Sequence, residues 1–162
     1  MIAGENTTMH ENSMIQMARY RDIYVDDGEK ILDVGSKCIK NQPTYKQIFT
    51  WQNYTGMDIV SGPNVDIVGW DHLLMNGYEH VVCGQVLEHV GNPFEFVQYM
   101  KYFFTKTICI IAPNAGREHR YPLDCWRIFP DGMRTLFEYA GIEPLEIYKS
   151  KADTIGIGAI YD

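Results

Sequence analysis

The sequence predicts an α/β fold in which a doubly wound sheet of seven strands is mostly parallel and ends in an antiparallel hairpin. Apolar runs bounded by turn residues alternate with amphipathic helical segments between residues 30 and 141. The run 107–113 is apolar throughout, which is typical of a strand covered on both faces. The last two strand-like segments, 143–150 and 153–161, are two residues apart and should pair as a hairpin.

Four further strands are expected before residue 88. Each combines apolar residues with a following turn or loop, and the clearest turn is the Ser-Gly-Pro that closes the second strand. The expected strands are 30–36, 54–60, 65–70 and 80–87. Together with the three later segments they complete a sheet that is parallel except for one strand.

Helical segments are expected between these strands. Residues 1–12 are polar and predicted to be loose, and a short helix follows on weak helical spacing over 14–18. A brief helix is predicted within 44–51. Asn92 and Pro93 form an N-cap and first helical position, and a later helix begins at Pro130 and ends at Gly141.

Composition narrows the possible functions. The 162 residues are enough for one domain, 1–162, and 46% hydrophobic with 22% charged residues is ordinary for a globular protein. A formal net charge of −7 argues against nucleic-acid binding. The chain begins without the pattern of a signal peptide and has no apolar run long enough for a membrane span, so we expect a cytoplasmic protein. The four cysteines have no metal-site spacing, and no metal is expected.

Polar residues stand at or just beyond the carboxyl ends of several expected strands, where ligands bind in doubly wound sheets. These residues are Asp33, Asp58, Gln85 and Asn114. Gly35 would let a ligand approach the backbone closely, and a carboxylate such as Asp58 can accept from both hydroxyls of an adenosine ribose. The alternatives are a purely structural first turn and a turn-capping Asp58.

The loop after the first strand separates two classes of adenosine-containing cofactor. A dinucleotide site favours G-x-G-x-x-G, whose glycines and helix N-terminus hold a pyrophosphate. Residues 35–40 read GSKCIK and contain only the first glycine. A nicotinamide oxidoreductase is therefore the poorer interpretation.

Four tracts together resemble the class I S-adenosylmethionine (SAM)-dependent methyltransferases, in particular the type 11 group related to ubiquinone-biosynthesis methyltransferases. They are KILDVGS, YTGMDIVSGPNVDIV, GQVLEHVGNP and the segment 112–141, in the family's order. The resemblance implies a Rossmann-like domain in which Asp33 and Gly35 border the methionine of SAM. It also implies that Asp58 binds the ribose and that Gln85 lies beside the methionine and sulfonium.

Two departures from the family's pattern fall near the expected cofactor site. The first loop has fewer glycines than usual, and the acid expected near the adenine stands one position late, at Asp71, because Trp70 occupies the usual place. The resemblance implies that Asp71 lies near the adenine. We expect Trp70 to fill core space, with stacking near the purine as the alternative.

A loop of about 17 residues follows the fifth strand and is too long to serve only as a connection. It contains the candidates for binding or activating the acceptor, which are Asn114, Arg117, His119, Tyr121, Asp124 and Arg127. His119 can act as a base, Asp124 can orient it, and the arginines can bind an acidic acceptor. The alternative is an Asp124–Arg127 ion pair that pins the loop, with Trp126 packed beneath it.

His89, just after the fourth strand, is a second candidate base; its alternative role is to tether the loop beside Glu88. The resulting hypothesis is methyl transfer from SAM to the oxygen or nitrogen of a small or medium-sized acceptor, with S-adenosylhomocysteine (SAH) as the product. The protein would be a monomer or homodimer. A SAM-binding regulatory or partner subunit without turnover is the alternative from a non-enzyme class.

Overall fold

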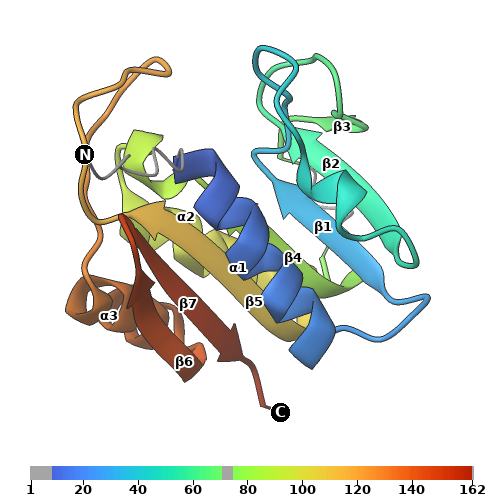
Figure 1. Cartoon of the computed structure of the whole chain (residues 1–162). Coiled ribbons are helices and arrows are strands. Elements are labelled where there is room, and N and C mark those ends of the chain that lie inside the picture. Colours follow the sequence, from blue (N-terminus) through green and yellow to red (C-terminus); the bar gives the residue numbers. More distant parts are fainter. Residues whose placement is uncertain (1–8, 71–74, 162) are drawn as a thin grey trace, which may run out of the picture.

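The computed structural model describes residues 9–70 and 75–161, which form a seven-stranded sheet with helices on both faces (Figure 1). The strands are β1 (Lys30–Val34), β2 (Asn53–Asp58), β3 (Ile67–Val68), β4 (Tyr78–Gly84), β5 (Phe104–Pro113), β6 (Glu143–Ser150) and β7 (Asp153–Ala159). Their spatial order is β3-β2-β1-β4-β5-β7-β6, and only β7 runs antiparallel to its neighbours. The predicted fold class is confirmed.

Three α-helices cover the sheet. The helix α1 (Met9–Tyr24) lies on one face, and α2 (Pro93–Met100) and α3 (Pro130–Ala140) lie together on the other (Figure 1). Single 3-10 turns are η1 (Tyr45–Gln47), η3 (Leu87–His89) and η4 (Lys101–Phe103). Because both faces are covered, β5 buries every residue from Ile108 to Pro113, as its apolar sequence predicts.

The start of α1 corrects one expectation. We expected residues 1–12 to be loose, but residues 9–12 are helical, while 1–8 lie outside the described residues. Asn12 and Ser13 are buried although they are polar, and they interrupt the apolar face that would have indicated a helix. Asn12 Nδ2 donates to Asp153 at 2.7 Å, and the Ser13 and Tyr45 hydroxyls share a short hydrogen bond. Contacts with the sheet and with η1, rather than amphipathic spacing, therefore hold this end of the helix.

The later helices follow their terminal signals. The Asn92 side chain accepts from the backbone N–H of Glu95 at 3.3 Å, and Gly141 ends α3 at φ 66°. The helix expected within 44–51 is only the three-residue turn η1. The end of the fourth strand also differs from the prediction. The strand β4 ends at Gly84, and residues 87–89 form η3 instead of extending the strand to residue 87.

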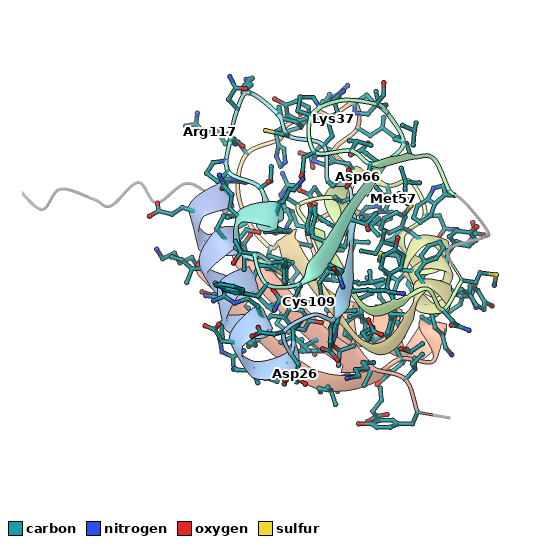
Figure 2. All side chains as sticks on the ribbon, turned by 90° about the vertical axis from the view of Figure 1, so that its right-hand side faces the viewer. Asp26, Lys37, Met57, Asp66, Cys109 and Arg117 are labelled. Carbon is teal, nitrogen blue, oxygen red and sulfur yellow. The ribbon has the colours of Figure 1, made fainter. Side chains whose placement is uncertain are left out.

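The parallel strands all end at the same edge of the sheet. In Figure 2, Lys37 and Arg117, from the loops that follow β1 and β5, both lie at this end, and Asp26, which precedes β1, lies at the opposite end. The chain proceeds from β1 to β2 on one side and reaches β4 on the other side of β1. The winding therefore reverses between β1 and β4, and a ligand site is expected beyond their carboxyl ends.

Candidate functional site

A pocket of about 150 Å³ lies at the point where β1 and β4 end. Its walls come from Asp33, residues 35–39 and 42–45, Gly84 with Gln85, and His10 of α1. The volume is below the roughly 300–1,000 Å³ of pockets that enclose a drug-sized ligand. The pocket is therefore large enough for one part of an extended ligand, with the remainder lying toward the neighbouring strand ends.

Gly35 allows the tight turn that opens this pocket. Its φ is +83°, and a Cβ at this position would stand 2.2 Å from Cγ2 of Val86. The backbone N–H groups of Gly35 and Ser36 both donate to the carbonyl oxygen of Met57, at 2.8 and 3.1 Å. The loop after β1 is thereby held against the end of β2, and the turn requires glycine on both conformational and steric grounds.

Asp33 is the buried acid of the pocket, with 3% of its surface exposed. Burial raises the pKa of its carboxyl to about 7, and the charge of Asp58 adds to the rise. The Tyr54 hydroxyl donates to Asp33 Oδ2 at 2.5 Å and opposes that shift. Because burial opposes ionisation of this carboxyl, a cationic group bound beside it would favour the carboxylate.

Gln85 offers the pocket an acceptor. It has φ 58°, and its Nε2 donates to Asp153 Oδ1 at 2.9 Å. Its Oε1 is buried without a hydrogen-bond partner among the described residues. Asp153 is itself fully buried and also accepts from Asn12. The hydrogen bond from Nε2 to Asp153 occupies the nitrogen end of the Gln85 amide. The oxygen Oε1 therefore remains available to a donor on a ligand.

Asp58 lies at the end of β2 and is half-buried, but it is not among the residues that line the pocket. Its two carboxylate oxygens accept from the backbone N–H groups of Lys37 and Val60, each at 3.1 Å. It therefore caps the turn after β2, which is the alternative role named above, and ties that turn to the loop after β1. Each carboxylate oxygen still has a second lone pair for a ligand hydroxyl.

The adenine end of the predicted site is described only in part. Asp71 lies outside the described residues. Trp70 makes edge contacts with Phe96 and Tyr99, at ring-centroid distances of 5.4 and 5.0 Å, and stacks on Phe103 at 5.8 Å. This packing supports the core role expected for Trp70.

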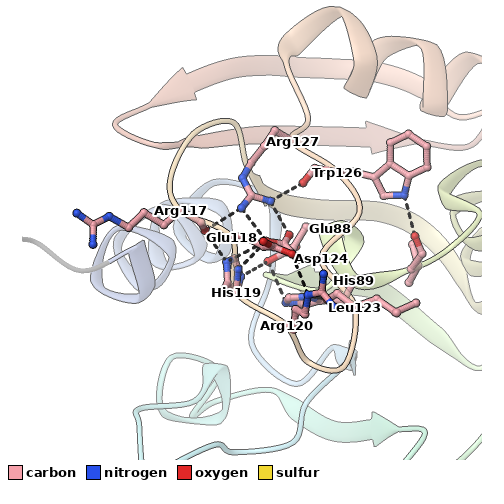
Figure 3. Close-up of polar contacts among 11 residues, drawn as sticks. Glu88, His89, Arg117, Glu118, His119, Arg120, Leu123, Asp124, Trp126 and Arg127 are labelled. Carbon is pink, nitrogen blue, oxygen red and sulfur yellow. Dashed lines mark hydrogen bonds and ion pairs between the residues drawn. The ribbon is translucent and has the colours of Figure 1, made fainter.

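The loop after β5, residues 114–129, is pinned by the ion pair that we considered as an alternative. Arg127 donates two hydrogen bonds to the Asp124 carboxylate, at 2.6 and 2.9 Å, and the backbone N–H of His119 donates a third at 2.7 Å (Figure 3). The Asp124 side chain is 2% exposed, and the Arg127 guanidinium holds the pKa of this carboxyl well below its usual range. Asp124 and Arg127 thus hold the loop, and both carboxylate oxygens are engaged.

The side chains of four other loop residues take no part in this ion pair. Asn114 is buried and bonds to the β6–β7 hairpin, through its N–H to the Ala152 carbonyl and through Nδ2 to the Thr154 hydroxyl. Arg117 and Tyr121 are exposed. Trp126, which that alternative placed beneath the loop, is instead 41% exposed. Its indole N–H donates to the carbonyl of Val90, which holds the ring at the surface.

His89 and His119 meet at the base of this loop although 30 residues separate them in sequence (119 − 89). Their rings, labelled in Figure 3, contact edge to face with centroids 5.0 Å apart. The His89 ring also contacts that of Tyr121, with centroids 6.1 Å apart. His89 Nδ1 lies 2.6 Å from the carbonyl oxygen of Leu123. His89 therefore does tether the loop, and the loop in turn brings His119 beside it.

Glu88 is the residue that sequence reasoning missed, since we named it only as a neighbour of His89. Its side chain is fully buried, and neither carboxylate oxygen has a hydrogen-bond partner within the described part of the chain. Oε1 lies 3.4 Å from His89 Nε2 and 3.6 Å from His119 Nε2. Burial raises the pKa of this carboxyl, whereas its own backbone N–H and the two imidazoles, when protonated, oppose the rise. The only signal in the sequence is an acid directly before His89, which does not distinguish a buried carboxyl from an exposed one.

The candidate residues thus fall into two groups at one edge of the sheet. Asp33, Gly35 and Gln85 line one pocket, with Asp58 bonded to its rim. His89, His119, Asp124 and Arg127 gather around Glu88 under the loop after β5, with Tyr121 against His89. The two groups are neighbours because Gln85 and Glu88 stand three residues apart in the turn after β4.

Among the described residues, no helix combines the length and apolar character needed to cross a bilayer.

Comparison with known proteins identifies the fold. No family model matches the sequence, and no curated protein matches it. Among solved structures, a Bacillus halodurans protein described as a methyltransferase has a TM-score of 0.65 and 14% identity over 83% of this chain and 68% of its own. A SAM-dependent methyltransferase from Aquifex aeolicus has a TM-score of 0.61 and 11% identity over 91% and 98% of the two chains. The trans-methyltransferase CalH, solved with SAH, has a TM-score of 0.63 and 12% identity over 91% and 54%. The chain has the Rossmann-like fold of these proteins.

Proposed function

We propose that the protein binds SAM in the pocket beyond β1 and β4 and transfers its methyl group to the oxygen or nitrogen of a small or medium-sized acceptor. The observation that carries the proposal is the pocket itself. A buried acid (Asp33), a glycine turn (Gly35) and an amide oxygen without a partner among the described residues (Gln85) meet at the winding reversal of a fold shared with methyltransferases.

The residues present fit the methionine part of SAM. Its ammonium group is a donor, and the Gln85 Oε1 and Asp33 carboxylate are acceptors within one pocket. The fixed positive charge of the sulfonium suits a carboxyl whose pKa lies near 7, because a nearby cation favours its ionised form. In this proposal the free lone pairs of Asp58 take the two ribose hydroxyls, and Asp71 lies toward the adenine.

Methyl transfer asks little covalent chemistry of the protein. SAM supplies a methyl group on a good leaving group, so the acceptor lone pair forms a bond to the methyl carbon while the C–S electron pair returns to sulfur, giving SAH. The protein has to align the acceptor with that bond and to remove the acceptor's proton where there is one. We assign both tasks to the loop after β5, with His119 or His89 as the base and Arg117 and Tyr121 exposed toward the acceptor.

Two measurements test the proposal. SAM or SAH should raise the melting temperature, because a ligand that binds only the folded state stabilises it, and NADH should do much less. Release of SAH should then appear with a competent member of a library of hydroxyl and amine acceptors. A shift with NADH and none with SAM would contradict the assignment of the pocket. Binding of SAM without turnover on any acceptor would favour the alternative of a SAM-binding regulatory or partner subunit.

A further inference from the structure

We propose that Glu88, His89 and His119 form a binding site for one divalent transition-metal ion, of which Zn²⁺ is the model. One ligand atom of each residue lies within 4.8 Å of the other two. The three residues come from two segments, the turn η3 and the loop after β5, which the fold brings together at the carboxyl end of β4 (Figure 3). The site is distinct from the pocket that we assign to SAM.

The distances from Glu88 to the two imidazoles suit a single ion. Bonds of about 2.0–2.2 Å to a tetrahedral Zn²⁺ place the ligand atoms about 3.3–3.6 Å apart. Glu88 Oε1 lies 3.4 Å from His89 Nε2 and 3.6 Å from His119 Nε2. These separations are too long for good hydrogen bonds, but they match two edges of such a tetrahedron.

The outer nitrogens of both imidazoles have the partners that metal-binding histidines use. His89 Nδ1 lies 2.6 Å from the Leu123 carbonyl, and His119 Nδ1 lies 3.2 Å from the Arg117 carbonyl. A carbonyl oxygen only accepts, so each Nδ1 carries a proton, and in the neutral form of each imidazole Nε2 presents its lone pair toward Glu88. This pattern fixes the tautomer and the ring orientation in metal sites.

Glu88 supplies an independent reason to expect a cation. A fully buried carboxylate to which no described residue donates a hydrogen bond is costly, and such a group is found where it is paired with a cation or binds a metal. In their neutral form the two imidazoles direct lone pairs at the carboxylate and do not stabilise it, whereas a metal ion between them would bind all three side chains. Two imidazole ligands favour Zn²⁺, Fe²⁺ or Co²⁺ over Mg²⁺ and Ca²⁺, which prefer oxygen ligands.

Three protein ligands leave at least one coordination position open. The His89 and His119 side chains are 14% and 31% exposed, whereas Glu88 is covered, so the open side faces the surface next to Tyr121. If the proposed methyl transfer holds, an acceptor oxygen would occupy this position, and the cation would lower the pKa of an acceptor hydroxyl. In that case His119 holds the cation and is not needed as the base.

Metal titration of the purified full chain tests the site. After removal of any affinity tag and dialysis against a chelator, Co²⁺ is added and its visible d–d absorption is followed, and Zn²⁺ binding is measured by calorimetry. We expect one ion per chain, with an affinity that falls at least about 100-fold in His119→Ala and in His89→Ala. The matched control is His10→Ala, which removes a histidine outside the cluster and should retain the metal.

Circular dichroism of each apo variant separates loss of the site from loss of the fold. If His89→Ala does not fold, His119→Ala still tests the site, because its side chain is partly exposed on a loop. Wild-type protein that is folded but binds no ion in a one-to-one ratio would overturn the proposal, as would unchanged affinity in the folded variants. The titration needs neither SAM nor turnover. Metal binding without SAM binding would therefore contradict only the proposed function, and the reverse would contradict only this site.

Discussion

Two buried carboxyls stand at the same edge of the sheet, and they differ in what surrounds them. Asp33 receives a hydrogen bond from Tyr54, and its pocket contains the free amide oxygen of Gln85. Glu88 receives no hydrogen bond from the described residues, and two imidazoles face it at 3.4 and 3.6 Å. Although both carboxyls are buried, the two proposals therefore give them different ligands, an organic cation at Asp33 and a metal ion at Glu88.

The difference extends to the backbone around each carboxyl. Asp33 lies inside β1, where ladder hydrogen bonds to β2 and β4 hold it, so its position does not depend on a loop. The cluster around Glu88 depends on the loop after β5, which the Asp124–Arg127 pair fixes in place. Substitutions in the loop should therefore alter the cluster around Glu88 and leave the pocket at Asp33 unchanged.

The largest effect is expected from His119→Ala. Methyl transfer should fall about 10²- to 10⁴-fold, whether His119 removes a proton or holds a metal ion, while SAM affinity stays nearly unchanged because His119 does not line the pocket. Steady-state kinetics and calorimetry measure the two quantities. Arg120→Ala is the control on the same loop, since its side chain is 73% exposed and, among the described residues, bonds only to Glu118, which is also exposed.

Asp124→Ala separates chemistry from loop structure. Because Asp124 binds Arg127 and the His119 N–H, its loss should lower both stability and transfer, whereas SAM affinity should change little. If SAM affinity falls along with stability, the pocket at Asp33 and the cluster around Glu88 are coupled. That result would contradict the expectation that loop changes leave the pocket unaffected. Full activity in both Asp124→Ala and His119→Ala would remove the loop from the reaction and leave His89 as the candidate.

The second effect is a pH dependence of stability that comes from Asp33. Its pKa is about 7 in the folded chain, against about 3.9 for an unperturbed Asp. The folded state thus binds more protons between these pH values, and the free energy of unfolding falls as pH rises from about 4 to 7 and then levels off. An amide cannot ionise, so the Asp33→Asn variant should become more stable relative to wild type over that range, by at most about 4 kcal/mol.

Urea denaturation at several pH values between 4.5 and 8 measures this difference. Asp27→Asn, at an exposed position, is the matched control and should track wild type across the range. A constant difference between Asp33→Asn and wild type would mean that Asp33 is ionised throughout and that burial does not raise its pKa.

Asp58→Ala should weaken SAM binding at least about tenfold, because the ribose hydroxyls lose a charged acceptor whose hydrogen bonds contribute about 1.5–3 kcal/mol. Calorimetry with SAH measures the change. The backbone N–H groups of Lys37 and Val60 also lose their acceptor, so a melting curve has to accompany each titration. Unchanged affinity in the folded variant would leave Asp58 with its turn-capping role alone.

The smallest effect should come from Tyr54→Phe, which makes Asp33 more like Glu88 by removing its only side-chain donor among the described residues. The Tyr54 hydrogen bond lowers the pKa of Asp33, so the pKa should rise above 7 in the variant. A loss of about 1 kcal/mol in stability is expected at pH 8, where the ionised carboxyl needs the donor. NMR titration of the carboxyl carbon reports the shift, and a lower pKa would contradict the role of Tyr54.

The order of the elements, and the edge of the sheet that holds the site, could be predicted from local signals in the sequence. Apolar runs and terminal signals such as Pro130 and Gly141 can be identified without knowing what packs against them. The same holds for Asp33 and Gly35, because a strand's carboxyl end is defined by the strand itself. Predicted bounds were wrong where burial mattered, as for the polar start of α1, whose Asn12 and Ser13 bond to partners far along the chain.

Which polar residues meet depends on the tertiary structure. His89 and His119 are brought together by a loop whose path depends on the Asp124–Arg127 pair and on the Cys125 N–H bond to the Glu88 carbonyl. Glu88 reads as an ordinary charged residue in a sequence, because burial is a property of everything that covers it. The expectation of no metal rested on spacing along the chain. The metal site that we propose is built from two segments and has no such spacing, because its three side chains meet only where the folded loop lies over the end of β4.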